Sequence, residues 1–284
     1  MFATIRVDNW DEACKIGASL QRWGFRGQSN EAWVPESTLL RARELYRCSP
    51  KWTNHREYWM LRQFQRRFSA YAGTIPTPTS KLDWLAVMQH YGGVTRLVDF
   101  SHSFYVAAFF AVEHAANDAA VWAISKTAFA KRIAQFQGRE DACDDEWRNI
   151  ANAEFAEPYV GLRDLPAVPI KFAVPFEPEF LHHRLISQQG FFLCPLDLTS
   201  TLIENLEASF ELPGKVRNNR KELSWETCSG DLDNYAALKI ILPHRIHSAA
   251  AKDLHRMNIN AATLFPGLDG YARSMTIHLR TFAE

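Results

Sequence analysis

Three short segments of the chain carry residue types that could perform chemistry. The first is Phe25-Arg26-Gly27-Gln28, in which a guanidinium stands beside a residue with no side chain. An arginine grips anions through a planar fork of donors, and a glycine lets the backbone approach a ligand closely. We therefore expect Arg26 and Gly27 to contact an anionic ligand, although a solvated arginine at the end of a surface strand would give the same pattern.

The second segment runs from Gln89 to Ser101 and brings a histidine, an arginine and a carboxylate close together in the sequence. The imidazole of His90 titrates near neutral pH, as a general acid or base must. Asp99 could orient this imidazole, or it could pair with Arg96 in a buried structural network. Both interpretations stay open at the level of the sequence.

The third segment contains Gln188 and Gln189, at the point where a helix is expected to turn into a strand. An amide both donates and accepts hydrogen bonds, which suits recognition of a ribose hydroxyl or a carboxamide, although a helix cap would use the same groups. The adjacent His182 and His183 would face different sides of a helix, so no metal site built from both is expected.

Residue periodicity predicts the elements that must position these segments. Alternating or compact apolar runs predict strands at 23–28, 94–100, 120–124, 170–174, 190–194 and 237–242. Helical spacing predicts helices at 10–22, 55–72, 82–91, 104–116, 177–187 and 243–257. Because strands and helices do not alternate strictly, we expect an α+β fold with a mixed sheet and flanking helices.

The composition is that of a packed globular protein. Of 284 residues, 47% are hydrophobic and 23% charged, and the most apolar run, Phe104–Val112, is about half of the ~20 residues that a membrane-spanning helix needs. The N-terminal segment has no apolar stretch typical of a secretory signal. Five widely separated cysteines without a C-x-x-C pair argue against a disulfide framework and a zinc site. We therefore expect a cytoplasmic protein that makes no use of a membrane.

Several common catalytic motifs are absent, which narrows the classes of enzyme. The sequence contains no G-x-G-x-x-G, P-loop, H-E-x-x-H, G-x-S-x-G or EF-hand loop. A metal-dependent nuclease that uses Asp83, Asp99 and Glu113 is the least favoured interpretation, because these carboxylates do not form a cluster with ligand spacing.

The charges cancel over the whole chain but not along it. Residues 41–68 hold eight Lys or Arg against two Glu, interleaved with aromatic residues, whereas residues 139–157 hold seven acidic residues against two Arg. The basic stripe could bind single-stranded nucleic acid, or its aromatic residues could form the core face of a helix whose arginines are solvated. The two segments could also face one another. We treat them as a basic helical insertion at about 41–72 and an acidic insertion at about 139–165.

Taken together, the segments resemble the FRG-domain family, which is named after the tripeptide seen here as Phe25-Arg26-Gly27. The further stretches that match the family lie in the same order along the chain: Trp33 to Arg41, Trp84 to Gly92, Thr95 to Asp99, Ala107 to Glu113, Gln188 to Phe191 and Leu264 to Gly270. The resemblance implies a single FRG domain over residues 1–284.

More remotely, the chain resembles the arginine-class ADP-ribosyltransferases. In these enzymes an aromatic-Arg-Gly strand opens the site, a second strand and a helix follow, and a late element with a glutamate completes it. Here Arg26 and Gly27 match the first element, while Gln188 and Gln189 take the place of the third without its glutamate. The resemblance implies an ADP-ribosyltransferase-like core and an enzyme that uses NAD to modify a macromolecular acceptor, either nucleic acid or protein.

The same resemblance implies roles for individual residues. Arg26 would hold the pyrophosphate or the nicotinamide ribose of NAD, and Gly27 would let the backbone meet the carboxamide. The residues expected to be catalytic are Arg26, His90, Asp99 and Gln189, and those expected to bind NAD are Phe25, Arg26, Gly27, Gln28, Tyr91, Arg96, Phe100 and Gln188, with Tyr91 or Phe100 stacked on the nicotinamide.

Such an enzyme would suit a toxin or a phage-defence effector with an antitoxin or another regulatory partner. No metal site is expected. The alternative is a sensor without catalysis that binds a nucleotide or a nucleic acid.

Overall fold

The computed structural model describes residues 1–138, 152–164, 170–179, 182–212, 214–218 and 221–281, and shows one eight-stranded sheet in the order β5-β6-β3-β2-β4-β8-β1-β7. The strands are β1 (Phe2–Arg6), β2 (Trp23–Gln28), β3 (Val98–Ser101), β4 (Ala119–Ser125), β5 (Ala173–Phe176), β6 (Gly190–Pro195), β7 (Glu222–Leu223) and β8 (Ala237–Leu242). β1 pairs in parallel with β7 and β8, and the other pairs are antiparallel. The predicted α+β fold with a mixed sheet is thus confirmed.

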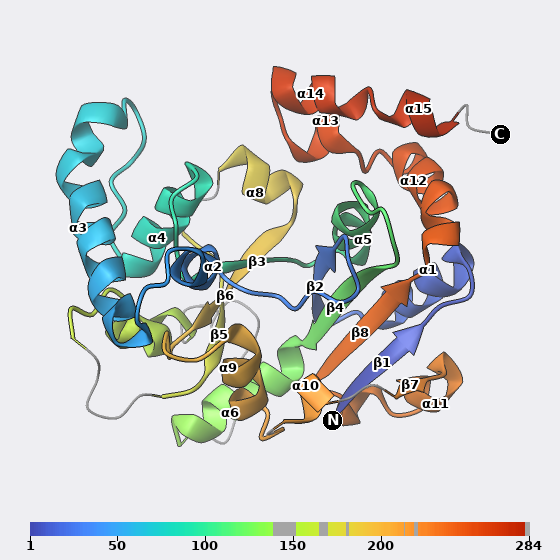
Figure 1. Cartoon of the computed structure of the whole chain (residues 1–284), viewed down its shortest axis with the longest axis horizontal. Coiled ribbons are helices and arrows are strands. Elements are labelled where there is room, and N and C mark those ends of the chain that lie inside the picture. The colour runs from blue at the N-terminus through green and yellow to red at the C-terminus, as the bar shows by residue number, and fades with distance from the viewer. Residues whose placement is uncertain (139–151, 165–169, 180–181, 213, 219–220, 282–284) are drawn as a thin grey trace.

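Helices flank both faces of this sheet. Those of the described residues are α1 (Trp10–Ser19), α2 (Thr38–Leu45), α3 (Thr53–Tyr71), α4 (Lys81–His90), α5 (Phe104–Val112), α6 (Lys126–Phe136), α8 (His183–Ser187), α9 (Leu202–Ser209), α10 (Lys215–Asn218), α11 (Trp225–Ser229), α12 (His247–Arg256), α13 (Ala261–Leu264), α14 (Leu268–Ser274) and α15 (Ile277–Thr281). α3 and α4 lie on one side of the molecule, and α1 and α12 lie on the other (Figure 1).

Three apolar clusters hold these layers together. α1, α5 and α12 bury their apolar residues against one face of the half-sheet built from β2, β4, β8 and β1. α6 and α9 cover the other face, around Trp122 and Phe100. α3 and α4 pack on β5 and β6, where Phe68 lies 4.8 Å from Trp84, edge to face. The interpretation that Tyr58, Phe64 and Phe68 form the core face of their helix is therefore confirmed for Phe64 and Phe68, whereas Tyr58 is half-buried and is not part of this cluster.

The sheet separates between β2 and β3. These strands pair at one position, Phe25 with Ser101, whereas β2 pairs with β4 along its whole length from Trp23 to Gln28. Beyond Phe25 the edge of β2 that faces β3 is therefore open, and residues 26–28 border the space between the two halves of the sheet.

Local patterns predicted β2 and β8 with their observed bounds, but β3 begins at Val98 and not at Val94. The backbone of Thr95 is engaged elsewhere: its N–H donates to the hydroxyl of Thr38, and its carbonyl accepts from the N–H of Leu39. The segment before Val98 is therefore docked on α2 and is unable to join the sheet. α8 is also shorter than predicted, because His182 caps it by accepting from the N–H of Leu185.

Within the part of the chain that the structure describes, no helix is both long enough and apolar enough to cross a bilayer. Four cysteines are free there: Cys14, Cys48, Cys194 and Cys228. Residues 139–151 and 165 of the predicted acidic insertion, about half of it, lie outside the described residues.

Candidate functional site

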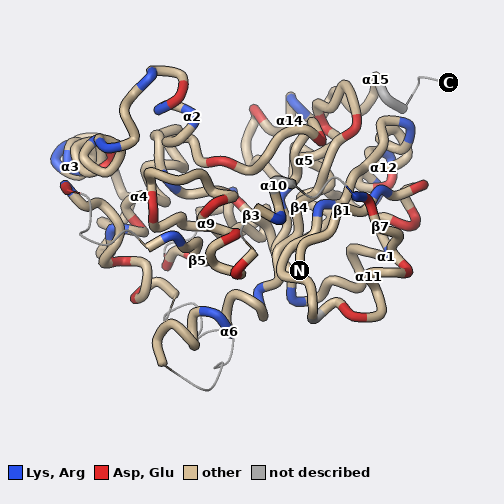
Figure 2. The backbone as a smooth tube through the Cα atoms, turned by 60° about the horizontal axis from the view of Figure 1, so that its bottom comes forward, with Lys and Arg blue, Asp and Glu red and all other residues tan. Residues whose placement is uncertain are grey.

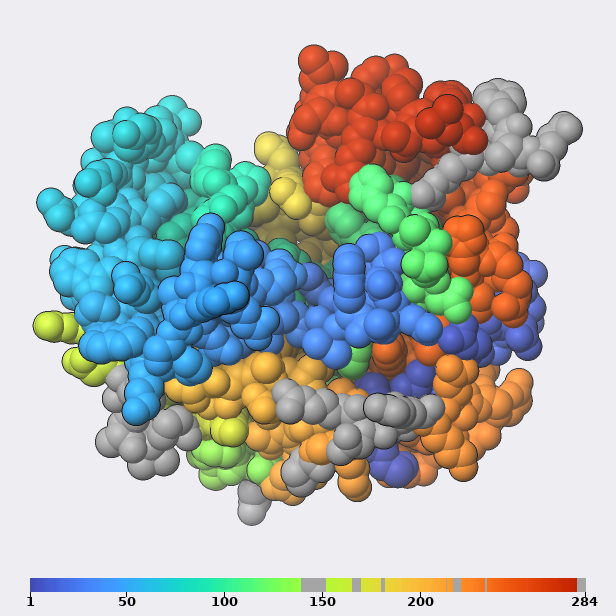
Figure 3. Space-filling view, viewed as in Figure 1, coloured from blue at the N-terminus to red at the C-terminus, as the bar shows by residue number. Residues whose placement is uncertain are grey.

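A cavity of about 290 Å³ occupies the place where β2 and β3 separate. Its polar wall is built from residues of β2, β3, α2 and α8, and Trp33 and Phe110 contribute aromatic surface. The space-filling view shows a recess at this place, bordered by the blue α2 segment, the yellow α8 and the red C-terminal helices (Figure 3). The volume is at the lower end of the roughly 300–1,000 Å³ that is usual for small-molecule sites.

Arg26 lies on β2 and reaches across the separation of the strands. Its Nη1 donates a 2.6 Å hydrogen bond to the backbone carbonyl of Asp99 and is 3.8 Å from the carboxylate of the same residue. The Arg26 side chain is 18% exposed, and burial lowers the pKa of its guanidinium while the charge of Asp99 opposes that effect. The Nε atom of Arg26 is buried and has no hydrogen-bond partner among the described residues.

Gln28 follows two positions later on the same strand. The residue is 7% exposed, and its Oε1 is also buried without a hydrogen-bond partner among the described residues. Because side chains alternate along a strand, Arg26 and Gln28 belong to the same face of β2. A buried donor and a buried acceptor, both without partners, therefore lie on the same face of β2, two residues apart, in the cavity wall. Such groups are costly unless a ligand or water satisfies them.

Gly27 lies between them and faces α5. A Cβ atom at this position would lie 1.9 Å from the backbone carbonyl oxygen of Ala107 and 2.6 Å from the backbone nitrogen of Ala111. The glycine thus permits close packing of β2 against α5. This packing explains the residue without the approach of a carboxamide to its backbone that the sequence had suggested.

Asp99 lines the cavity, and its side chain is 65% exposed. Gln89 holds it by donating a 3.0 Å hydrogen bond, and Gln89 itself accepts from the hydroxyl of Thr95. The expectation that Asp99 orients His90 or pairs with Arg96 is therefore wrong. Among the described residues that line the cavity, Asp99 is the only acid, against three arginines, Arg26, Arg41 and Arg184. The site is suited to an anion.

Arg96 does not contribute to the cavity. It is fully buried and forms a two-pronged ion pair with Glu57, and its Nη1 donates to the backbone carbonyls of Tyr159 and Pro195. The same carboxylate of Glu57 accepts from the N–H of Gly161 at 3.2 Å. Arg96 is thus a structural residue, which corrects its assignment to NAD binding.

Three other predicted site residues also lie away from the cavity lining. His90 stacks on His182 with ring centroids 3.5 Å apart, and Tyr91 lines a different groove. Gln189 is exposed in a left-handed conformation with a φ of 46°. Its neighbour Gln188 lines the cavity instead and donates from Nε2 to the carbonyl of Leu264.

The aromatic residues at the cavity differ from those expected. Phe25 and Phe100 border it, but their side chains are 2% and 4% exposed and pack in the core. Trp33, 56% exposed, and Phe110 offer accessible surface, and both were missed. Trp33 begins one of the stretches that match the FRG family, which was an available signal. Phe110 lies in the apolar run of α5, where the sequence does not distinguish it from core residues.

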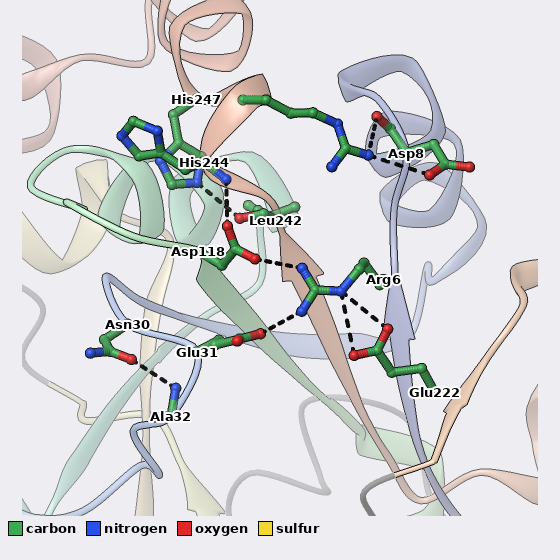
Figure 4. A network of polar contacts seen from close by, with 11 residues as sticks. Arg6, Asp8, Asn30, Glu31, Ala32, Asp118, Glu222, Leu242, His244 and His247 are labelled. Carbon is green, nitrogen blue, oxygen red and sulfur yellow. Dashed lines mark hydrogen bonds and ion pairs between the residues drawn. The ribbon is translucent and has the colours of Figure 1, made fainter.

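The loop that carries Trp33 is anchored by a polar cluster around Arg6 (Figure 4). Arg6 on β1 forms ion pairs with Glu31 at 3.0 Å, Asp118 at 2.5 Å and Glu222 at 3.1 Å. The N–H of Glu31 also donates to the carbonyl of Asp118. These contacts fix residues 29–33 against the sheet, and so determine where Trp33 meets the cavity.

Comparison with known protein families gives a match for the part of the chain that contains most of this cavity. Residues 21–120, from the loop before β2 to the start of β4, match the family described as FRG domain. Over these residues the chain is similar to the FRG-domain family. No curated protein and no solved structure matches the chain.

The matched FRG segment supplies Arg26, Gln28, Trp33, Arg41 and Asp99 to the cavity. α8 completes the wall with Arg184 and Gln188 from outside the match. The tripeptide that gives the FRG family its name therefore lies at the point where the sheet separates.

Proposed function

We propose that the cavity between β2 and β3 binds NAD, and that the protein is an ADP-ribosyltransferase-like enzyme. The observation that carries this proposal is the pair of unpartnered buried groups, the Nε donor of Arg26 and the Oε1 acceptor of Gln28. A primary amide offers one acceptor oxygen and one donor nitrogen side by side. The carboxamide of nicotinamide therefore complements both groups at once.

The charges and rings around this pair fit the rest of a dinucleotide. Arg41 and Arg184 would hold the pyrophosphate, since guanidinium groups bind phosphate oxygens in pairs. Trp33 and Phe110 would stack on the planar rings. Arg184 lies 4.7 Å from the ring centre of Phe265, a cation–π contact that limits where its guanidinium can go.

Asp99 is the residue we assign to the chemistry. NAD would supply the ADP-ribosyl group to the acceptor, with nicotinamide as the leaving group. The carboxylate of Asp99 would take the proton that the acceptor loses, or stabilise positive charge that develops at the site. Its contacts with Gln89 and Arg26 hold it at the cavity. In arginine-class ADP-ribosyltransferases a late glutamate serves the site, whereas Gln188 and Gln189 stand at that place here.

Gln188 would contribute orientation. The hydroxyl of Ser101 donates to its backbone carbonyl at 2.7 Å, and its side-chain nitrogen donates to the carbonyl of Leu264. These bonds direct the amide so that its oxygen can accept from a ribose hydroxyl.

The experiment that tests the activity follows labelled NAD in a cell lysate with wild-type protein and with an Asp99→Asn variant. We expect label to be transferred to a macromolecular acceptor by the wild type and not by the variant. The alternative function is a nucleotide sensor without catalysis, in which case the wild type binds NAD but neither transfers label nor consumes NAD. If the activity is that of a toxin or a phage-defence effector, expression of the wild type should arrest growth, and expression of Asp99→Asn should not.

A further inference from the structure

A second, larger hollow lies between α3, the end of α4 and the loop that follows it. This groove has a volume of about 890 Å³ and does not include any residue of the cavity described above. Phe64, Phe68 and Met88 belong to its lining and are buried or half-buried. Trp59 and Tyr71 also line it, and they are 46% and 83% exposed. Large aromatic side chains exposed beside an apolar groove are typical of a binding surface.

The groove is elongated along α3. The residues of α3 that line it are Arg56, Trp59, Met60, Gln63, Phe64, Arg67, Phe68 and Tyr71, spaced as one continuous stripe of a helix. From the first to the last of them the helix rises by about 22 Å. An occupant that contacts the whole stripe is therefore itself extended, and a helix of about four turns has this length.

Two arginines, Arg56 and Arg67, line the groove, and the described part of its lining contains no acidic residue. Arg67 is held beside Gln63 by a 2.7 Å hydrogen bond. Arginines recur along α3, which carries several basic positions in the charge-coloured view (Figure 2). The occupant is therefore expected to carry negative charge along one edge and apolar side chains along the face that enters the groove.

Single-stranded nucleic acid fits these features less well than a protein segment. Sites for single strands have a succession of cationic side chains that follow the phosphates. Here the other arginines of the helix, Arg62 and Arg66, are exposed but are not part of the groove lining. The apolar lining instead resembles the grooves that receive the apolar face of an amphipathic helix.

We propose that this groove binds an acidic amphipathic helix of a protein partner. Met60 and Met88 lie in the lining, and methionine side chains adapt to differently shaped apolar partners. The groove should therefore select for amphipathic pattern and charge more than for one sequence. This site is independent of NAD binding, so the two proposals can succeed or fail separately.

The test measures fluorescence anisotropy with three labelled 16-residue peptides. The first is an amphipathic helix of Leu and Glu, the second has Lys in place of Glu, and the third has the composition of the first in an order without an apolar face. We expect the first peptide to bind at least tenfold more tightly than the others. Trp59→Ala and Arg67→Glu should each weaken it at least tenfold, whereas Arg66→Glu, on the same helix outside the groove, should change its affinity less than threefold.

Four outcomes would overturn the proposal. The first is equal affinity of the wild type for the first and third peptides, and the second is an equal effect of Arg67→Glu and Arg66→Glu on the affinity for the first peptide. The third is tighter binding of a 15-nucleotide oligo-dT than of the first peptide, lost in Trp59→Ala. The fourth is a wild-type dimer, seen by light scattering, that the Trp59→Ala substitution dissociates. The third result would assign the groove to nucleic acid, and the fourth to a second copy of the chain.

Discussion

The guanidinium of Arg26 donates to the backbone carbonyl of Asp99 at 2.6 Å, across the point where β2 and β3 separate. This bond ties together the two halves of the sheet that the cavity lies between. It fixes Nη1 and leaves Nε of the same guanidinium without a partner among the described residues. The side chain of Arg26 thus links β2 to β3 and also offers an N–H donor to the cavity.

Replacing Arg26 by lysine should weaken NAD binding at least tenfold, because lysine keeps the charge but loses the planar arrangement of donors. The melting temperature should stay within a few degrees of the wild type, since the ammonium can still contact the carbonyl of Asp99. Isothermal titration with NAD and a thermal melt measure both quantities. A loss of binding that only mirrors a loss of folded protein would make Arg26 a scaffold residue.

Replacing Arg96, in contrast to Arg26, should lower the stability of the fold. Arg96→Ala leaves the carboxylate of Glu57 buried without its cation, which should cost about 3 to 5 kcal/mol of unfolding free energy. Urea denaturation compares this variant with the wild type and with Arg26→Lys. An unfolding free energy of Arg96→Ala within about 1 kcal/mol of the wild-type value, instead of the expected loss of about 3 to 5 kcal/mol, would contradict the structural role of Arg96.

Gly27→Ala should destabilise the fold by about 1 to 3 kcal/mol or more, because the added methyl group meets the backbone of α5 and a backbone contact is hard to relieve. Gly230→Ala is the matched control, since a Cβ at Gly230 meets no atom within 4 Å. Denaturation midpoints for both variants decide the question. Equal midpoints would show that Gly27 is not required for packing.

The stacked pair of His90 and His182 should make stability fall in acid. Burial, and then the charge of His90, lower the pKa of His182 to about 4. Because the unfolded chain takes up a proton near pH 6.5 and the folded chain does so only near pH 4, this contribution is present above pH 6.5 and is lost as the pH falls toward 4.

His182→Asn keeps a side chain that can cap α8 and does not titrate. Urea midpoints at pH 7, 5.5 and 4.5 should fall less steeply for this variant than for the wild type. Parallel pH profiles of the two proteins would show that folding does not lower the pKa of His182.

The sequence predicted those helices and strands that depend on residues close together in the chain. The alternation of Trp23 to Gln28 identified β2, and the apolar run Phe104–Val112 identified a buried helix. The start of β3 was wrong because Thr95 bonds to Thr38, which is 57 positions away. The partner of Arg96 was wrong for the same reason, since Glu57 stands 39 positions earlier.

The candidate site was predicted in part. Arg26, Gln28, Asp99 and Gln188 lie in one cavity, whereas His90, Tyr91 and Gln189 do not line it. The prediction for Gln189 missed by one residue, because at the end of α8 Gln188 lines the cavity and Gln189 is exposed to solvent. Arg41 and Arg184 reach the cavity through the packing of α2 and α8. Arg41 ends the stretch from Trp33 that resembles the FRG family, whereas no local pattern marks Arg184.

NAD affinity and thermal stability, measured for the wild type and for Gln28→Leu, test NAD binding at the cavity between β2 and β3. Leucine removes the unpartnered buried acceptor and nearly keeps the volume. We expect the variant to be at least as stable as the wild type without ligand, because a buried polar group with no partner is costly, and to bind NAD at least tenfold more weakly. Failure of the wild type to bind NAD, or equal NAD affinity of the two proteins, would contradict NAD binding at this cavity.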